Sequence, residues 1–191
     1  MQRDINTREE KTELSIRDTY KCQLIYLQAT VPVRTIVLNE ELIKCEFEGD
    51  TFSSKLTKEF FDGIHSIAPK VFQGCKVLIS VTLSGSLKVI GDYAFWDCTN
   101  LKIVYVGGNV SKIGEGAFRG CTNLEEVCFE ENYSLKEIGD YAFYDCKHLK
   151  CIKFPPKLQS LGGSTFDGCK RLKSADIPEG VKVIKARTFW D

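Results

Sequence analysis

The chain has 191 residues, of which 43% are hydrophobic, so it is long and apolar enough for one sizeable domain with a core. Its 26 basic residues balance 26 acidic ones, so no net charge attracts nucleic acid or an anionic membrane. No stretch approaches the roughly 18 uninterrupted apolar residues of a membrane span, and the charged N-terminus lacks the apolar region of a secretory signal. We therefore expect no nucleic-acid partner and no membrane insertion by this segment.

Residues 1–63 do not follow the spacing that governs the rest of the chain. The first 15 residues or so are polar enough to be disordered, whereas the segments CQLIYLQ and VRTIVLN are rich in strand-forming residues. The segment LIKCEF at residues 42–47 imitates a strand of the later repeats. We predict an irregular, β-rich N-terminal cap, because a stack of repeats needs a cover on its first open face.

Residues 64–191 repeat with a step of 23 residues that lengthens once to 25. The nonamer IGDYAFWDC at residues 90–98 returns as IGDYAFYDC at residues 138–146. The unit I-G-x-x-A-F-x-x-C-x-x-L-x-x-V-x-L gives about five full repeats. The last one is truncated where the next cysteine is due, and we expect a piece of a longer protein. The recurring aromatic residue is Phe72, Phe95, Phe118, Phe143, Phe166 or Phe189, and the recurring cysteine is Cys75, Cys98, Cys121, Cys146 or Cys169.

Each part of the unit predicts one element. In L-x-x-V-x-L the last two apolar residues are two apart, so they share one face of a short strand whose other face meets water. The A-F-x-x-C spacing suits a helical or 3₁₀ turn, and the glycines on either side supply corners. One such coil buries too little apolar surface to fold alone, so the coils must stack. The sequence therefore predicts an α/β repeat solenoid with parallel strands.

The unit resembles two repeat patterns of increasing specificity. LKIVYVGGN at residues 101–109 resembles the leucine-rich repeat template, and the I-G-x-x-A-F-x-x-C-x-x-L form is similar to the BspA-like repeats of bacterial and protist surface proteins. That resemblance implies a non-catalytic protein-binding module for surface recognition or adhesion, and a place at the cell surface. The alternative is an intracellular scaffold of the same fold. The missing secretory signal and the reduced-looking cysteines, which suggest a cytoplasmic location, favour it.

The cysteines also permit a chemical interpretation. The five recurring cysteines occupy one inward corner, which predicts buried thiols rather than disulfides or zinc ligands. Cys128 and Cys151 lie instead on outward strand positions, and with His148 they form the minor alternative of a thiol or metal-dependent enzyme. No C-x-x-C pair occurs, and neither His65 nor His148 lies in a recognisable catalytic motif. We therefore expect no catalytic residue, no metal and no cofactor.

The remaining candidates are surface residues. Side chains at the same level of stacked parallel strands form a contiguous face, the usual binding surface of a solenoid. Tyr93, Trp96, Tyr141, Tyr144 and Trp190 recur on the turns, where we expect them to stack coil on coil, with partner contact as the alternative. The candidate partner-binding residues are Ile103, Tyr105, Glu126, Cys128, Lys153 and Asp176 on the strands, with Tyr133 on the two-residue insertion.

Overall fold

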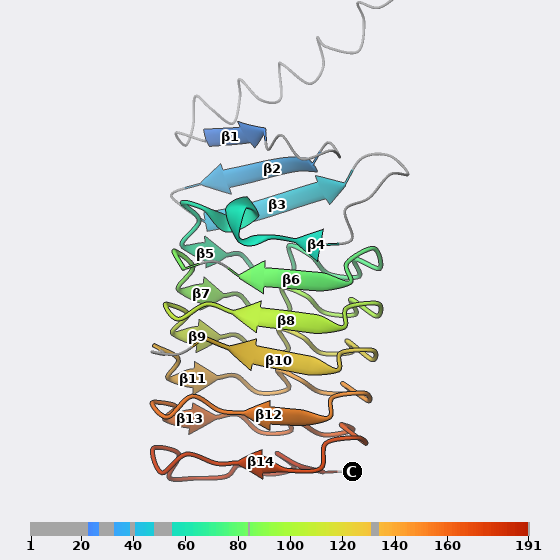
Figure 1. Cartoon of the computed structure of the whole chain (residues 1–191), viewed down its shortest axis with the longest axis vertical. Coiled ribbons are helices and arrows are strands. Elements are labelled where there is room, and N and C mark those ends of the chain that lie inside the picture. The colour runs from blue at the N-terminus through green and yellow to red at the C-terminus, as the bar shows by residue number, and fades with distance from the viewer. Residues whose placement is uncertain are drawn as a thin grey trace, which may run out of the picture.

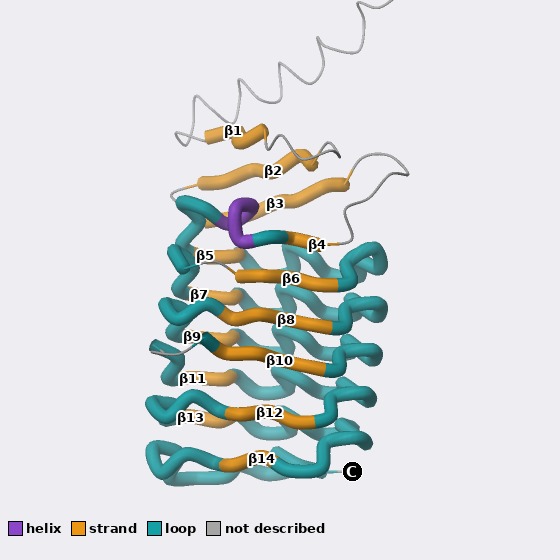
Figure 2. Tube along the Cα trace, in the orientation of Figure 1, coloured by secondary structure: helices purple, strands orange, loops and turns teal. Residues whose placement is uncertain are grey.

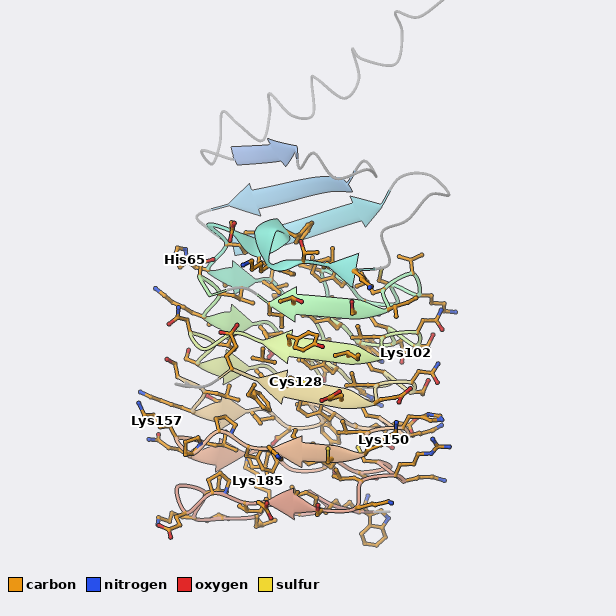
Figure 3. The ribbon with its side chains drawn as sticks, in the orientation of Figure 1. His65, Lys102, Cys128, Lys150, Lys157 and Lys185 are labelled. Carbon is orange, nitrogen blue, oxygen red and sulfur yellow. The ribbon has the colours of Figure 1, made fainter. Side chains whose placement is uncertain are left out.

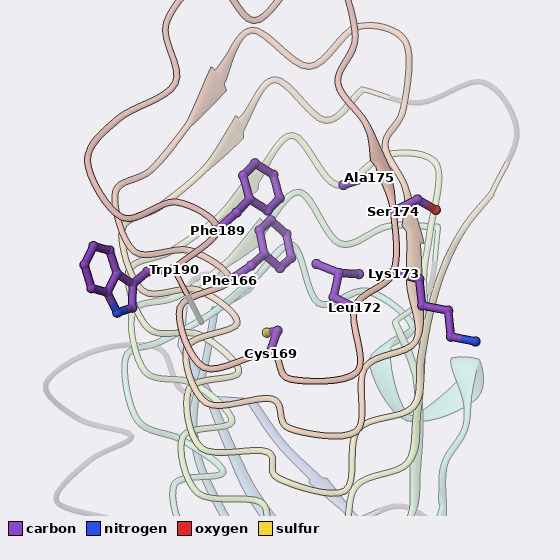
Figure 4. Close-up of a pocket in the computed structure, with 8 residues that line it drawn as sticks. All are labelled: Phe166, Cys169, Leu172, Lys173, Ser174, Ala175, Phe189 and Trp190. Atoms are coloured by element: carbon purple, nitrogen blue, oxygen red, sulfur yellow. The ribbon is translucent and has the colours of Figure 1, made fainter.

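The computed structural model describes residues 23–26, 33–38, 41–47, 55–83, 85–130 and 134–190. The described coils stack along one axis (Figure 1), and each coil except the last, which carries β14 (Ala175–Asp176) alone, contributes one strand to each of two sheets. We call these the front sheet and the rear sheet. The third side of each coil is a turn segment between the rear strand and the next front strand, so that the coils enclose a core seen end-on in Figure 4. The repeat solenoid predicted from the sequence is confirmed.

The front sheet contains six parallel strands in the order β14-β12-β10-β8-β6-β4. Their register keeps the repeat, since Val81 pairs with Val104 and Val104 with Val127. These valines are buried, whereas their strand neighbours face outward, as the alternating pattern requires. The strands are β4 (Lys55–Leu56), β6 (Ser80–Leu83), β8 (Ile103–Val106), β10 (Glu126–Phe129), β12 (Cys151–Lys153) and β14 (Ala175–Asp176).

The rear sheet contains eight strands in the order β1-β2-β3-β5-β7-β9-β11-β13. From β3 onward the neighbours are parallel, whereas β1, β2 and β3 pair antiparallel and extend the sheet at its N-terminal end. The strands are β1 (Gln23–Tyr26), β2 (Val33–Leu38), β3 (Glu41–Phe47), β5 (Ser66–Ile67), β7 (Val89–Ile90), β9 (Lys112–Ile113), β11 (Glu137–Ile138) and β13 (Ser160–Leu161).

The β-rich N-terminal region predicted from the sequence is therefore present, and it is continuous with the solenoid. The core also extends before residue 64, because Leu56, Phe60 and Phe61 are buried within it. Phe60 and Phe61 belong to the 3₁₀ helix η1 (Lys58–Phe61). The expectation of disorder over the first 15 residues lies outside the described residues.

The turn segments contain single 3₁₀-type turns that do not continue into helices. The Cys98 N–H donates to the Phe95 carbonyl at 3.3 Å, as a 3₁₀ turn requires. Tyr93 and Asp97 nevertheless have φ values of 57° and 56°, and left-handed residues interrupt a right-handed helix. Their N–H groups donate to the next coil instead. Among the described residues η1 is thus the only helix (Figure 2), and the helical part of the predicted α/β class is reduced to these turns.

The recurring phenylalanines form one continuous stack through the core. Ring centroids of successive phenylalanines from Phe72 to Phe189 lie 4.8–5.4 Å apart with interplanar angles of 5–10°. The thiols line up beside this stack, and the Cys98 Sγ donates to the Phe72 carbonyl of the preceding coil at 3.1 Å. Cys121, Cys146 and Cys169 make the equivalent bond. The repeated Phe and Cys positions therefore hold neighbouring coils together.

Candidate partner-binding surface

The outward residues of the front sheet form two columns that cross the strands. Ile103 lies opposite Ser80 on one side and Glu126 on the other, and Glu126 lies opposite Cys151. In the second column, Tyr105 lies opposite Thr82 and Cys128. Lys153 lies opposite Asp176 farther along the same sheet. The structure thus brings six of the candidate residues onto one face, whereas Tyr133 lies outside the described residues.

Tyr105 is the most prominent aromatic residue of this front face. Its side chain is 43% exposed, and the neighbouring Ile103 is half-buried. Ile79, just before β6, is also exposed, at 39%. Exposed aromatic residues contribute disproportionately to binding energy at protein interfaces. The face therefore offers an apolar centre flanked by charged residues.

A shallow hollow of about 360 Å³ opens where β8, β10 and β12 begin. Lys102 and Lys150 mark its position in Figure 3. The Lys150 Nζ lies 2.5 Å from Glu125 Oε2, and this hydrogen bond lowers the pKa of the Glu125 carboxyl. Both signs of charge therefore border the hollow, which suits a polar protein partner better than an apolar ligand. Its lining residues are Lys102, Ile103, Glu125, Glu126, Lys150 and Cys151.

Of these lining residues, Ile103 and Glu126 are among the partner-binding candidates predicted from the sequence, and Cys151 belongs to the minor alternative of a thiol or metal-dependent enzyme. Lys102, Glu125 and Lys150 occupy the position just before each strand and recur with the same step as the other columns. The signal was therefore present in the repeat. What the periodicity did not supply was the pairing of Lys150 with Glu125 across neighbouring coils.

The outward Cys128 thiol is not activated as a nucleophile. The Cys128 Sγ donates to Glu126 Oε1 at 3.2 Å. Burial, and then this hydrogen bond to a carboxylate, raise the pKa of Cys128 to about 11, so the thiol is neutral at physiological pH. Cys151 lies opposite Glu126 rather than opposite Cys128, and within the described part of the chain no cluster of His, Cys, Asp and Glu could hold a metal ion.

The inward thiols and His148 have structural roles. Burial raises the pKa of both Cys121 and Cys146 well above the ordinary value, which keeps these thiols protonated. His148 Nδ1 lies 2.7 Å from the Thr122 carbonyl. Asn100 and Asn123, at the same position of earlier repeats, donate to carbonyls one coil back in the same way. His148 thus belongs to a corner of the coil, which its alignment with these asparagines in the sequence could have indicated.

None of the helices in the described part of the chain has the length and apolar character needed to cross a bilayer.

Comparison with known proteins places the chain among leucine-rich repeat proteins. A solved leucine-rich repeat protein of T. pallidum is 28% identical, with a TM-score of 0.68 over 78% of this chain and 71% of that one. A leucine rich cell surface protein of Faecalibacterium prausnitzii A2-165 is 25% identical, with a TM-score of 0.66 over 88% of this chain and 46% of that one. This chain therefore spans less than half of the second relative.

A leucine-rich repeat protein of Bacteroides ovatus, 22% identical with a TM-score of 0.59, shares the fold over 84% of this chain and 40% of that one. No curated protein matches the chain. The BspA type leucine-rich repeat region matches residues 45–135 and 131–191 in six copies. Leucine-rich repeats of this kind generally form protein-binding scaffolds rather than catalytic sites. The resemblance stated from the sequence is confirmed, and the chain belongs to the family of BspA type leucine-rich repeat proteins.

Proposed function

We propose that the protein recognises another protein through its front face, and that this recognition serves attachment at the cell surface. The observation that carries the proposal is the exposed Tyr105, which lies between Thr82 and Cys128 in a column of otherwise small or charged side chains. The candidate contact residues are Ile103, Tyr105, Glu126, Cys128, Lys153 and Asp176, together with Tyr133. Neither a metal nor a cofactor is needed for this role.

The front face combines an exposed aromatic residue with exposed charges. The Lys150–Glu125 ion pair is solvent-exposed, with side-chain exposures of 57% and 41%, so it stabilises the fold little and remains available to a partner. The hollow beside it admits a side chain of the partner next to Ile103 and Cys151. Tyr105 supplies the apolar contact, and the charged rim orients the partner.

The surface assignment is supported by the F. prausnitzii relative, which is described as a cell surface protein. The second candidate is an intracellular scaffold that uses the same face. The thiols of Cys128 and Cys151 favour it, since neither forms a disulfide and Cys151 is exposed. An exposed free thiol persists more readily in a reducing compartment than outside the cell.

Photocrosslinking in cells that make the full-length protein tests the binding face. A photoreactive phenylalanine at position 105 is expected to crosslink a partner that the same residue at position 136, preceding the rear strand β11, does not. Tyr105→Ala is then expected to weaken the purified complex by about 2 kcal/mol, the cost of losing a hot-spot residue, as measured by calorimetry. Lys136→Ala, an exposed control, is expected to leave the affinity unchanged. Equal crosslinking from both positions would exclude the front face.

A membrane-impermeant maleimide separates the two compartments. On intact cells it is expected to label the exposed Cys151 if the protein is at the surface, with Cys151→Ser as the matched control. Labelling that appears only after lysis would instead support the intracellular scaffold.

A further inference from the structure

The turn side of the solenoid carries its own outward column, formed by the residue that follows each phenylalanine of the stack. Figure 4 shows the arrangement in the last coil, where Phe189 points into the core and Trp190 points away from it. Successive rings of the phenylalanine stack from Phe95 to Phe189 lie 5.2–5.4 Å apart, so neighbouring members of the outward column are spaced similarly. The column reads Gln73, Trp96, Arg119, Tyr144, Asp167 and Trp190.

Arg119 shows how this column holds a cation. Its guanidinium carbon lies 6.0 Å from the Trp96 ring centroid in the preceding coil and 4.9 Å from the Tyr144 ring centroid in the following coil. The Tyr141 ring, also in the following coil, lies 5.9 Å away. Aromatic faces attract a cation within about 6 Å. Rings two coils apart therefore hold a guanidinium group in the coil between them.

Asp167 occupies the equivalent place one step farther along the column. The Asp145 N–H donates to the Asp167 carbonyl, and the Gly168 N–H donates to the Trp190 carbonyl, each at 2.8 Å. The same two backbone bonds flank Arg119, where the Asp97 N–H donates to Arg119 and the Gly120 N–H donates to Tyr144, also at 2.8 Å. Asp167 thus lies between the coils of Tyr144 and Trp190 as Arg119 lies between those of Trp96 and Tyr144.

The two positions differ in the charge and length of the central side chain. Aspartate is short and negative where arginine is long and positive, so a ligand cation can enter between the rings and meet a carboxylate. Trp190 is 59% exposed, and the Arg187 guanidinium carbon lies 5.3 Å from its ring centroid, which shows that this ring accepts a cation.

The charge of the surrounding surface specifies the partner. The turn segments 91–98, 114–121, 139–146, 162–169 and 185–190 carry six acidic residues and three basic ones, Arg119, Lys185 and Arg187. Some of these acids are engaged internally, since Asp140 pairs with Lys185 at 3.1 Å and Asp145 with Lys147 at 3.2 Å. The remaining excess of negative charge attracts a basic partner.

We propose that Tyr144, Asp167 and Trp190 form a docking slot for an arginine or lysine side chain of a basic protein segment that lies along the turn side. Arginine fits better than lysine, because its planar group both stacks on the rings and pairs with the carboxylate. This surface is distinct from the front face, so its test does not depend on the function proposed there.

Fluorescence anisotropy with a labelled octapeptide of alternating arginine and glycine tests the slot. The glutamate–glycine octapeptide serves as the charge control, and the lysine–glycine octapeptide tests the preference between the two cations. The arginine peptide is expected to bind most tightly and to weaken as salt is added. Binding of the arginine peptide that is absent, or no tighter than that of the glutamate peptide, would overturn the proposal.

Variants locate the binding. Asp167→Arg places a guanidinium in the slot from within and is expected to weaken the arginine peptide by more than about tenfold, through lost pairing and added repulsion. Glu179→Arg makes the same charge change on an exposed loop of the last coils and is expected to have less than about a twofold effect, because exposed charges are screened with distance. Equal effects of the two variants would show that only general charge attraction holds the peptide, and would overturn the proposal of a specific slot.

Ring variants keep the test decisive if Asp167→Arg does not fold. Trp190→Ala and Tyr144→Ala are each expected to weaken the arginine peptide by about threefold, as an exposed cation–π contact predicts, while Tyr144→Phe retains the affinity. Thermal unfolding followed by circular dichroism verifies that each variant is folded. Unchanged affinity in both alanine variants would show that the rings are not part of a binding site.

Discussion

At the scale of single residues, the spacing between coils depends on positions that tolerate no side chain. A Cβ atom added at Gly139 would lie 2.7 Å from the Glu115 nitrogen and 3.0 Å from the Glu115 Cα. These are backbone atoms, which a side-chain rotation cannot move away. At Gly91 the nearest atom, the Ile67 carbonyl oxygen, would be only 2.3 Å away. The glycine of each I-G pair is therefore required by the close approach of stacked backbones.

Gly139→Ala is expected to lower the free energy of unfolding by about 1–3 kcal/mol, the usual cost of overpacking. Gly85→Ala is the matched control, because its Cβ would meet only the Asn109 side chain, at 3.9 Å. Urea denaturation compares the two variants. Similar urea midpoints for the two variants would show that the stacked backbones can accommodate a side chain at position 139 without loss of stability.

The raised pKa of Cys128 predicts slow alkylation. Only the thiolate reacts, so with a pKa of about 11 the rate with iodoacetamide is expected to rise about tenfold per pH unit from pH 7 to 10. Glu126→Gln removes a carboxylate that raises this pKa and is expected to accelerate the reaction several-fold. Glu137→Gln, on the rear sheet, is the control. Peptide-resolved mass spectrometry measures the rates, and a plateau below pH 9 would contradict the assignment.

At the scale of elements, the phenylalanine stack links one turn segment to the next. The Phe118 ring is fully buried between Phe95 and Phe143, whose centroids lie 5.2 Å and 5.4 Å away. Phe189 stacks on Phe166 alone among the described rings and is 42% exposed. The same residue type therefore contributes unequally according to its place along the axis.

Phe118→Ala is expected to cost about 3–5 kcal/mol, because it leaves a cavity that neighbours on both sides cannot fill. Phe189→Ala is expected to cost less than about 2 kcal/mol, since much of its surface is already in water. Urea denaturation of both variants measures the difference. Equal costs would mean that the stack is not cooperative along the axis.

At the scale of the whole molecule, each coil contacts mainly its neighbours, so stability approximates a sum of coil and interface contributions. The backbone hydrogen bonds follow this rule, since turn segments donate to the next coil and strands pair with the coils directly before and after. The front and turn sides differ in charge but share one core. Changes that preserve the repeat should therefore preserve the fold.

Deletion of residues 91–113, one whole repeat, joins Ile90 to Gly114 and restores the I-G pair. This variant is expected to fold cooperatively with reduced stability, as removal of one neighbour interface predicts. Deletion of residues 91–102, about half a repeat, puts inward and outward positions out of register and is expected to abolish cooperative unfolding. Circular dichroism with urea denaturation distinguishes them, and loss of structure in both would contradict the additive description.

Much of the architecture could be predicted from the repeat. The spacing identified the buried Phe and Cys positions and the outward columns, because one coil per step leaves few ways to align the strands. The turns were predicted less well, since the left-handed residues Tyr93 and Asp97 and their bonds to the next coil are not evident from local spacing. The contact of His148 with the Thr122 carbonyl one coil back is likewise not evident from local spacing.

The sequence by itself determined the solenoid, its step and its inward residues, because a periodic pattern of apolar side chains can be buried only by stacking one coil on another. The tertiary structure decided which outward residues meet. Lys150 pairs with Glu125 of the preceding coil. Arg119 lies against the rings of Trp96 in the preceding coil and Tyr144 in the following coil. Those contacts depend on the direction in which each side chain points toward the neighbouring coil. The periodicity brings the residues to the same level but does not fix these directions.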